Sequence, residues 1–252
     1  MKLENRVAVI TGAGPGGGIG YTIALAFLQE GAKVSLNYLA RNDEEKETFE
    51  KEMNQYADKV IITEGDISQE EVSEKLISNT VKKYGKIDIL INSAGISTPS
   101  LLQDMKVSNW DRMMDVNLKS VFLTTKSVIP FMVSQEFGRI INISSQVGQK
   151  GSVEHSHYAA AKAGVIAFTK SVAREVGRYG VTANCIAPGP IETSLMNEVS
   201  ETWKQEKMKE LVIPRLGEVE EVAPTAVFLA SSPDGDLYTG QTLGPNSGDV
   251  ML

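Results

Sequence analysis

The stretch Val7-Ala-Val-Ile-Thr-Gly-Ala-Gly-Pro-Gly-Gly-Gly-Ile-Gly20 joins an apolar run to a glycine-rich turn, and an amphipathic segment, 21–30, follows directly. A strand, a turn of glycines and a helix in this order are typical of the first unit of a dinucleotide-binding fold. The glycines let the backbone turn sharply and approach a pyrophosphate, whose charge is favoured at the amino end of the helix. Gly12, Gly14 and Gly17 meet the G-x-G-x-x-G pattern, although so many glycines make that match weakly specific.

The same alternation of short apolar runs and longer amphipathic segments continues along the chain. Runs that are apolar throughout, each followed by a helix, predict a parallel sheet that helices cover on both faces. We therefore expect an α/β doubly wound (Rossmann) fold with about seven strands in a single domain, residues 1–252. The predicted strands are 7–10, 33–36, 60–63, 87–91, 138–143, 181–186 and 241–243, and the predicted helices are 21–30, 44–56, 70–84, 110–136, 158–179 and 220–230.

Composition narrows the class of protein. The net charge of −7 argues against nucleic acid or an anionic membrane as a partner, because both need a basic face. Cys185 is the only cysteine, so an internal disulfide is impossible and a reducing compartment is expected. No stretch approaches the roughly 20 apolar residues of a spanning helix, and no apolar core of a secretion signal opens the chain. These observations predict a cytoplasmic protein that acts on a small molecule.

A tyrosine and a lysine predict acid–base chemistry. Tyr158 and Lys162 stand four residues apart at the start of a predicted helix, so their side chains share one face. A phenol has a reference pKa of about 10, and a nearby ammonium group favours the phenolate and moves this pKa toward a useful range. Ser145 follows the strand 138–143, where its hydroxyl could hold a substrate oxygen. By itself the Tyr–Lys spacing is not specific, because such pairs are common on helix surfaces.

The chain resembles the single-domain branch of the short-chain dehydrogenase/reductase family over nearly its whole length, with the motifs in that family's order. Thr11-Gly12 with Gly18-Ile19-Gly20 resembles its phosphate loop, Asn92-Ser-Ala-Gly95 is similar to its N-N-A-G motif, and Tyr158 with Lys162 matches its catalytic pair. The resemblance implies a nicotinamide-dependent oxidoreductase that moves a hydride between a carbonyl and its alcohol.

The resemblance also implies roles for single residues. Asn117, Ser145, Tyr158 and Lys162 would be catalytic: Ser145 and Tyr158 bind the carbonyl oxygen, and Tyr158 donates the proton. Lys162 would bind the ribose, and Asn117 would support a water chain that resupplies the proton. No metal is implied, and no group of His, Cys and carboxylate residues has ligand spacing. The expected cofactor-binding residues are Gly12, Gly14, Gly18, Ile19, Gly20, Tyr38, Arg41, Asp66, Ile67, Asn92, Ala94, Gly95, Tyr158, Lys162, Pro188, Gly189, Ile191 and Thr193.

Three features depart from the family pattern. The phosphate loop is two residues longer between Gly12 and Gly18, and Ser93 replaces the second Asn of the N-N-A-G motif. The segment Gly244-Pro-Asn-Ser-Gly248 stands where the family usually has an acidic residue and paired glycines, which puts the C-terminal contacts in doubt.

The end of the second strand should decide which nicotinamide is bound. An NAD site typically places a carboxylate there for the ribose diol, but this chain has Tyr38, with Arg41 within loop reach. The missing acid and the nearby guanidinium favour NADP(H), since a guanidinium suits a phosphate. NAD(H) remains open, because the phosphate loop lacks the basic residue that many NADP-dependent relatives carry.

The substrate is less well determined than the chemistry. The expected pocket walls are 97–102, 146–157 and 196–203, and the polar region 192–214 reads either as a flap over the site or as a surface excursion. The broadest resemblance is to 3-oxoacyl-thioester reductases and sugar dehydrogenases. The candidate substrate contacts are Ser145, Gln146, His155, Tyr158 and Met196.

Three alternatives stay beside the main interpretation. A 3-oxoacyl-carrier-protein reductase should present basic residues at the pocket rim, where Glu136 stands and Arg178 is the one plausible cation. A catalytically silent NAD(P)-binding regulator would not need all four catalytic residues, and an enoyl reductase places its Lys farther from its Tyr. Family members commonly assemble through long helices, here 110–136 and 158–179, so the resemblance implies a homotetramer.

Overall fold

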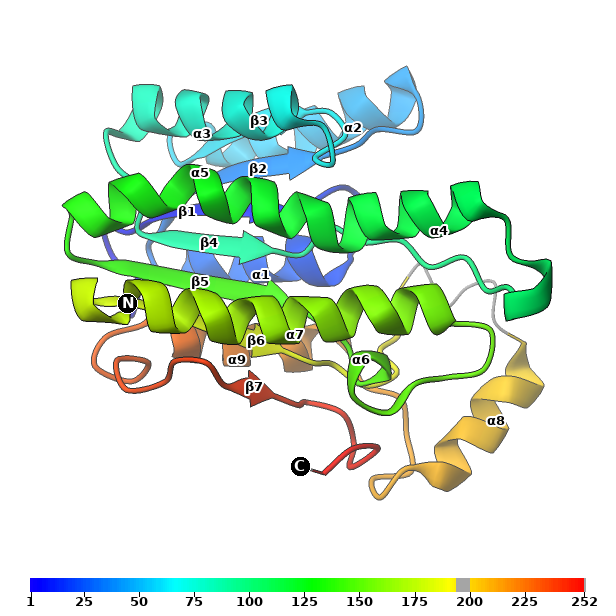
Figure 1. Cartoon of the computed structure of the whole chain (residues 1–252). Coiled ribbons are helices and arrows are strands. Elements are labelled where there is room, and N and C mark those ends of the chain that lie inside the picture. Colours follow the sequence, from blue (N-terminus) through cyan, green and yellow to red (C-terminus); the bar gives the residue numbers. More distant parts are fainter. Residues whose placement is uncertain (194–199, 252) are drawn as a thin grey trace.

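A computed structural model describes residues 1–193 and 200–251. These residues form one seven-stranded sheet between two layers of helices (Figure 1). The strands are β1 (Val7–Thr11), β2 (Lys33–Tyr38), β3 (Val60–Glu64), β4 (Ile89–Asn92), β5 (Gly138–Ile143), β6 (Val181–Ile186) and β7 (Thr242–Leu243). The α-helices are α1 (Ile19–Gln29), α2 (Asp43–Met53), α3 (Glu70–Tyr84), α4 (Val107–Met114), α5 (Ser120–Ser134), α6 (Val147–Lys150), α7 (Ser156–Val176), α8 (Glu201–Glu210) and α9 (Val219–Ala230).

The strand order is β3-β2-β1-β4-β5-β6-β7, and each neighbouring pair is parallel. The chain builds outward from β1 to β3, then crosses back to place β4 on the other side of β1. In such sheets a ligand binds in the crevice at the carboxyl ends of the strands, where the order reverses. The predicted doubly wound fold is confirmed, and it directs attention to the turns after β1 and β4.

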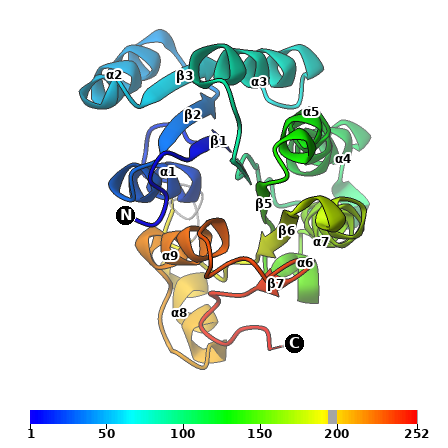
Figure 2. The same cartoon turned by 90° about the vertical axis from the view of Figure 1, so that its left-hand side faces the viewer.

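The sheet is buried on both faces, as the apolar runs predict. Within β4, Ile89 and Ile91 belong to the core beneath α1, α2 and α9, while Leu90 belongs to the core beneath α3, α5 and α7. Successive side chains of a strand point to opposite faces, so one apolar run supplies both cores. Figure 2 shows α1 and α9 on one side of the sheet and α3, α5 and α7 on the other.

The region 110–136, predicted as a single helix, is divided into three parts. Helices α4 and α5 are joined by a π-helical turn, η3 (Asp115–Lys119). A π-helical turn inside an α-helix leaves no glycine or proline signal in the sequence, and such turns are frequent at functional sites. The helix α8 was not predicted as an element of its own, and none of the described helices is long and apolar enough to cross a membrane.

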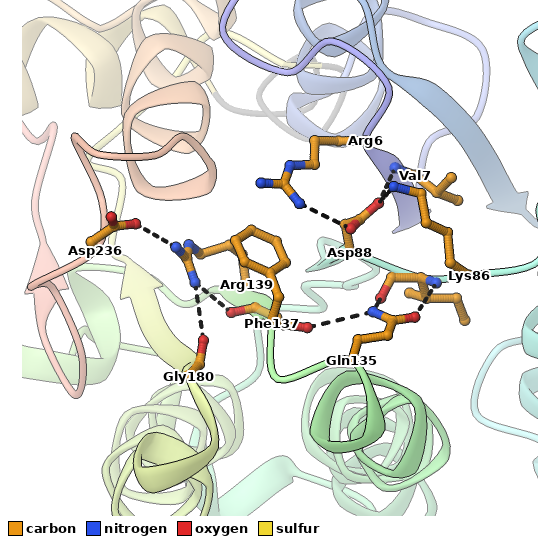
Figure 3. Close-up of polar contacts among 11 residues, drawn as sticks. Arg6, Val7, Lys86, Asp88, Gln135, Phe137, Arg139, Gly180 and Asp236 are labelled. Atoms are coloured by element: carbon orange, nitrogen blue, oxygen red, sulfur yellow. Dashed lines mark hydrogen bonds and ion pairs between the residues drawn. The ribbon is translucent and has the colours of Figure 1, made fainter.

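A buried carboxylate joins the amino ends of β1 and β4 (Figure 3). Asp88 accepts hydrogen bonds from the Val7 backbone N–H (2.8 Å) and from Arg6 (3.2 Å), and its other ion pair is with Lys86 (2.8 Å). The guanidinium groups of Arg6 and Arg139 both lie over the Phe137 ring, 3.8 and 4.3 Å from its centroid. This polar cluster lies at the amino ends of the strands. The ligand crevice is expected at the opposite, carboxyl ends.

We expect Asp88→Asn to destabilise the fold, because a side chain that is 5% exposed loses its charge while Arg6 and Lys86 keep theirs. The free energy of unfolding should fall by about 1–3 kcal/mol in urea titrations. Asp234→Asn is the matched control, since it removes an exposed pair with Lys2 and should cost less than about 1 kcal/mol. Equal losses for the two variants would contradict a special role for Asp88.

Candidate active site

The turn after β1 lies directly against the turn after β4. Gly12 has a φ of +64°, and a Cβ atom on it would lie 2.5 Å from the Cα of Ala94. Thr11 completes the contact, because its Oγ1 accepts hydrogen bonds from the backbone N–H groups of Ser93 (3.1 Å) and Ala94 (3.2 Å). The Thr-Gly pair and the N-N-A-G-like motif, distant in sequence, therefore form one platform at the point where the strand order reverses.

The longer phosphate loop leaves this platform intact. Gly16 and Gly17 have positive φ values of 92° and 71°, and a Cβ atom at either position would meet no other atom within 4 Å. Gly20, by contrast, packs so closely that its Cβ would lie 2.5 Å from the Gly12 carbonyl oxygen. The extra residues thus bulge into open space, and α1 begins in its expected place behind them.

Buried polar side chains support the carboxyl ends of the central strands. Asn92 at the end of β4 donates to the Oδ1 of Asn142 on β5 (2.8 Å) and accepts from Thr124 on α5 (2.7 Å). Asn142 in turn donates to Thr169 on α7 (2.8 Å). The side chain of Asn92, predicted to bind the cofactor, therefore joins β4 to β5 and α5 by hydrogen bonds, and Asn142 extends this network to α7.

Asn117 and Lys162 converge on Gly95. The π-helical turn places Asn117 so that its Nδ2 donates to the Ile96 carbonyl (3.0 Å), while its Oδ1 is buried and has no hydrogen-bond partner among residues 1–193 and 200–251. A Cβ atom on Gly95 would lie 2.8 Å from this Oδ1 and 3.5 Å from the Lys162 Nζ. A buried, unpartnered amide oxygen is a natural acceptor for an ordered water. The water chain stays a prediction, and this oxygen is the acceptor that it would need.

Lys162 is a buried cation with no carboxylate beside it in the described structure. Its Nζ donates to the Ile143 carbonyl (2.9 Å) and lies 5.7 Å from the centroid of the Tyr158 ring. Burial lowers the pKa of Lys162 from 10.5 to about 8, because the charged form loses its hydration. The pKa of this ammonium group therefore lies within about one unit of physiological pH, so a fraction of the lysine is neutral there.

Tyr158 and Ser145 meet at the carboxyl end of β5. Burial raises the pKa of Tyr158, and a hydrogen bond with Ser145 only partly opposes this effect. In the protein alone the direction is thus opposite to the lowering predicted from Lys162, because loss of hydration outweighs the distant ammonium group. A phenol with a raised pKa holds its proton, which suits a proton donor.

Tyr38 and Arg41, the residues expected to select the cofactor, differ in burial. Tyr38 is 1% exposed, its ring lies 4.7 Å from that of Phe49, and its hydroxyl is buried without a partner. Arg41 has an 81% exposed side chain and pairs with Glu45 (2.8 Å), which also accepts from the Arg41 backbone N–H. The structure thus presents Arg41 to solvent and keeps Tyr38 in the core beneath Gly14.

Asp66 after β3 is held by donors that the sequence argument did not single out. Ser68 donates to it from its backbone (3.0 Å) and its hydroxyl (2.7 Å), and Arg112 on α4 forms an ion pair with it (2.7 Å). Burial raises the pKa of this carboxyl, but the hydrogen bonds outweigh burial and keep it below its ordinary value. Its neighbour Ile67 is a core residue of the sheet face beneath α3.

The segment after β6 returns to the site. The Pro188 carbonyl accepts from the Gln146 backbone (3.1 Å), and Gly189 packs so tightly that a Cβ atom would lie 2.6 Å from the Cα of Asn246. Ile191 forms an isolated bridge with Gly217. Thr193 closes the described part of this segment, and Met196, a predicted substrate contact, lies outside the described residues.

Three further polar residues lie near Ser145 or Tyr158 in the chain: Gln146, His155 and His157. The predicted substrate contact Gln146 is 5% exposed, and among the described residues its Oε1 has no hydrogen-bond partner. The predicted contact His155 stacks edge-on against Tyr158, with 6.1 Å between ring centroids. His157, which was not among the predicted contacts, is buried, and its Nε2 lies 3.0 Å from the Thr98 carbonyl oxygen, so it ties the loop 97–102 to α7.

Comparison with known proteins places these features in context. The family model described as short chain dehydrogenase matches residues 6–204. The chain is 38% identical over 251 residues to 3-oxoacyl-[acyl-carrier-protein] reductase FabG of Thermotoga maritima, covering 100% of both, and 40% identical to 3-oxoacyl-[acyl-carrier-protein] reductase of Synechocystis sp., covering 99% of both. A Brucella melitensis crystal structure, titled short-chain dehydrogenase/reductase SDR:Glucose/ribitol dehydrogenase, superposes with a TM-score of 0.90 at 30% identity, covering 100% of this chain and 99% of the other.

We expect Lys162→Met to stabilise the fold below about pH 8, because it removes a buried cation. A shift from 10.5 to about 8 corresponds to about 3 kcal/mol, and loss of the bond to Ile143 leaves a gain of about 1–3 kcal/mol. Between these pH values the unfolded wild type binds more protons than the folded one. The wild type therefore gains stability as pH rises through this window, and the advantage of Met should shrink.

Denaturant titrations of both proteins at pH 7 and pH 10 measure this effect. Lys170→Met, on the exposed side of α7, is the control and should change stability by less than about 0.5 kcal/mol at either pH. A Met variant that is less stable than wild type at pH 7 would show that the buried lysine is a net stabilising group.

Proposed function

Because the chain belongs to the short-chain dehydrogenase family and is an NAD(P)-dependent oxidoreductase acting on a CH–OH/C=O pair, we propose that it reduces the 3-oxo group of an acyl thioester with NADPH. NADP(H) is the favoured cofactor. The observation that carries the proposal is the convergence of Asn117, Ser145, Tyr158 and Lys162 at the carboxyl ends of β4 and β5. This site stands in a chain that matches two 3-oxoacyl-[acyl-carrier-protein] reductases from end to end.

The residues present fit a dinucleotide. Gly12 and Gly20 pack closely together at the amino end of α1, where a pyrophosphate is favoured. Asp66 would accept from the adenine ring, Lys162 would donate to the nicotinamide ribose, and the segment from Pro188 to Thr193 would contact the carboxamide. When bound, the nicotinamide supplies the hydride. The unpartnered Asn117 Oδ1 supports this arrangement, since a buried amide oxygen calls for a donor.

The protein's own contribution is to deliver a proton and to stabilise developing negative charge. Ser145 and Tyr158 would both donate to the substrate carbonyl oxygen as it becomes an alkoxide. Tyr158, protonated at neutral pH, would pass its proton to that oxygen, and the ammonium group of Lys162 would have to offset the rise that burial gives the pKa of the phenol. Lys162, with a pKa of about 8, would return a proton to the phenolate through water held at Asn117.

A second candidate substrate is a sugar or polyol. The Brucella melitensis protein named above carries a glucose/ribitol dehydrogenase title, and the buried, unpartnered Oε1 of Gln146 would accept a hydrogen bond from a substrate hydroxyl. The relatives matched from end to end favour the thioester. A panel that contains acetoacetyl-CoA, ethyl acetoacetate, glucose and ribitol separates the two candidates.

Replacement of Tyr158 by Phe tests the catalytic assignment. We expect NADPH oxidation at 340 nm with acetoacetyl-CoA to fall at least about 1,000-fold, because the proton donor is lost, while NADPH binding stays within about threefold. Tyr238→Phe is the matched control, since this tyrosine packs on Phe228. Activity in Tyr158→Phe within about tenfold of wild type would refute the assignment.

Arg41 is the residue we propose to recognise the 2′-phosphate of NADPH. Arg41→Ala should raise the KM for NADPH about tenfold and leave that for NADH unchanged, because only the former offers a phosphate to the guanidinium. Glu45→Gln, which frees Arg41 from its present pair, should lower the KM for NADPH. Lys51→Ala, which removes an exposed cation from α2, the helix that carries Glu45, is the control. Equal effects of Arg41→Ala on both cofactors would contradict the proposal.

We also propose that the chain forms a homotetramer in the cytoplasm. Phe122 and Phe131 on α5 and Trp110 on α4 are 46%, 36% and 37% exposed, and apolar surface on long helices suits a subunit interface. Light scattering at micromolar concentration should give about four times the 27.3 kDa of one chain, and a monomer mass would refute the tetramer. The buried, free thiol of Cys185 fits a reducing compartment.

The flap predicted at 192–214 also enters the proposal. Its described helix, α8, lies beyond the carboxyl ends of the strands (Figure 1), and Ser145 follows the carboxyl end of β5 in the chain. A helix in this place would cover a substrate bound against the nicotinamide. What fixes α8 in position is then part of substrate recognition.

A further inference from the structure

The C-terminal segment that departs from the family pattern forms a compact turn. Asn246 is 6% exposed, its Oδ1 accepts from the Gly248 backbone (3.0 Å) and its Nδ2 donates to the Val250 carbonyl (2.9 Å). The Asp249 backbone N–H closes the turn by donating to the Asn246 carbonyl (3.0 Å). The turn therefore fixes the direction of the Asp249 side chain.

Asp249 binds two lysines from separate helices. Its Oδ1 lies 2.6 Å from the Nζ of Lys150, the last residue of α6, and 2.9 Å from the Nζ of Lys207 on α8. The Asp249 side chain is 3% exposed and that of Lys207 is 9% exposed. Burial raises the pKa of Asp249, but the hydrogen bonds from the two lysines outweigh it and hold the pKa below its ordinary value. We call Lys150, Lys207 and Asp249 the tail clasp.

The ten residues of helix α8 make few buried contacts of their own, and the buried residue Leu211 follows the helix directly. Lys207 is the one buried residue among its ten, so the helix contributes no buried apolar side chain. Its pairs Lys204–Glu201 and Lys209–Glu206 join residues of the same helix and cannot fasten it to the body of the protein. Most helices are held by an apolar face, whereas the buried contact of α8 is ionic.

The other end of the clasp reaches the catalytic residues. Helix α6 begins directly after Ser145, and the Val147 backbone N–H donates to the Ser145 Oγ (3.1 Å). Gly148 on α6 packs against α7 so closely that a Cβ atom would lie 2.7 Å from the carbonyl carbon of Lys162. A carboxylate that holds Lys150 at the end of α6 therefore restrains the short helix between Ser145 and Lys162.

We propose that Asp249 is a positioning residue that fixes α8 over the substrate and α6 beside Ser145 at the same time. The inference rests on the proposed function, because the effect on substrate follows only if α8 covers the site. Loss of the carboxylate would leave Lys150 without its counter-charge and Lys207 with Glu210 alone, a residue of the same helix, so the ionic link from α8 to the C-terminal turn would be lost.

Asp249→Asn tests the inference through two independent readouts. Hydrogen exchange of the protein without substrate should show the α8 amides exchanging at least about tenfold faster, with the amides of β4 and β5 unchanged. The KM for acetoacetyl-CoA should rise about tenfold because α8 is released, and kcat should fall about threefold because α6 is no longer held beside Ser145. Asp249→Glu, which keeps the charge, should recover part of the affinity, and Asp234→Asn should behave as wild type in both readouts.

A second pair of variants controls for general destabilisation. Lys207→Met removes the clasp from the side of the helix and should reproduce the faster exchange and the higher KM, whereas Lys209→Met removes an exposed pair of the same helix and should reproduce neither. Unchanged exchange in α8 would overturn the inference, and so would faster exchange with an unchanged KM. If the wild type reduces no 3-oxoacyl substrate, the proposed function fails, and exchange in α8 still decides whether Asp249 holds the helix.

Discussion

The close approach of Gly12 to Ala94 is the contact on which the site depends. It brings the turn after β1 within van der Waals distance of the turn after β4, and Thr11 locks the two together through two backbone N–H groups. The phosphate loop is thereby held in fixed relation to Gly95, around which Asn117 and Lys162 gather. A side chain at position 12 would push the nucleotide-binding half of the sheet away from the catalytic half.

The catalytic half is built from groups that an ordinary core would exclude. A lysine without a carboxylate and an asparagine oxygen without a donor are both buried, and each costs stability. The network from Asn92 through Asn142 to Thr169 supplies rigid support close by, because every one of its links is a buried hydrogen bond. Among the described residues, the buried polar groups that lack a partner are thus few, and the side chains around them make their hydrogen bonds.

The sequence predicted the sheet well because each strand is an apolar run with glycine or polar residues at its ends. The catalytic roles of Asn117, Ser145, Tyr158 and Lys162 stay predictions, which rest on the types and spacing of these residues and on the family resemblance. The π-helical turn that aims Asn117 left no local signal, so 110–136 read as one helix. Tyr38 was predicted to bind the cofactor at the end of a strand, and its ring packs inward against Phe49. The Arg41–Glu45 pair could have been predicted from the sequence, because a spacing of four brings side chains together near a helix. The tail clasp could not, because it joins residues up to 99 positions apart.

Helix α8 is attached by charge rather than by apolar packing, and this has a consequence for how such a protein diverges. With nine of its ten residues outside the core, almost any polar sequence could replace it without opening a cavity. Selection can therefore act on this segment while the stability of the Rossmann core stays untouched. The exposed surface of α8 is free to drift in a lineage, provided that the lysine at position 207 and its carboxylate are inherited together.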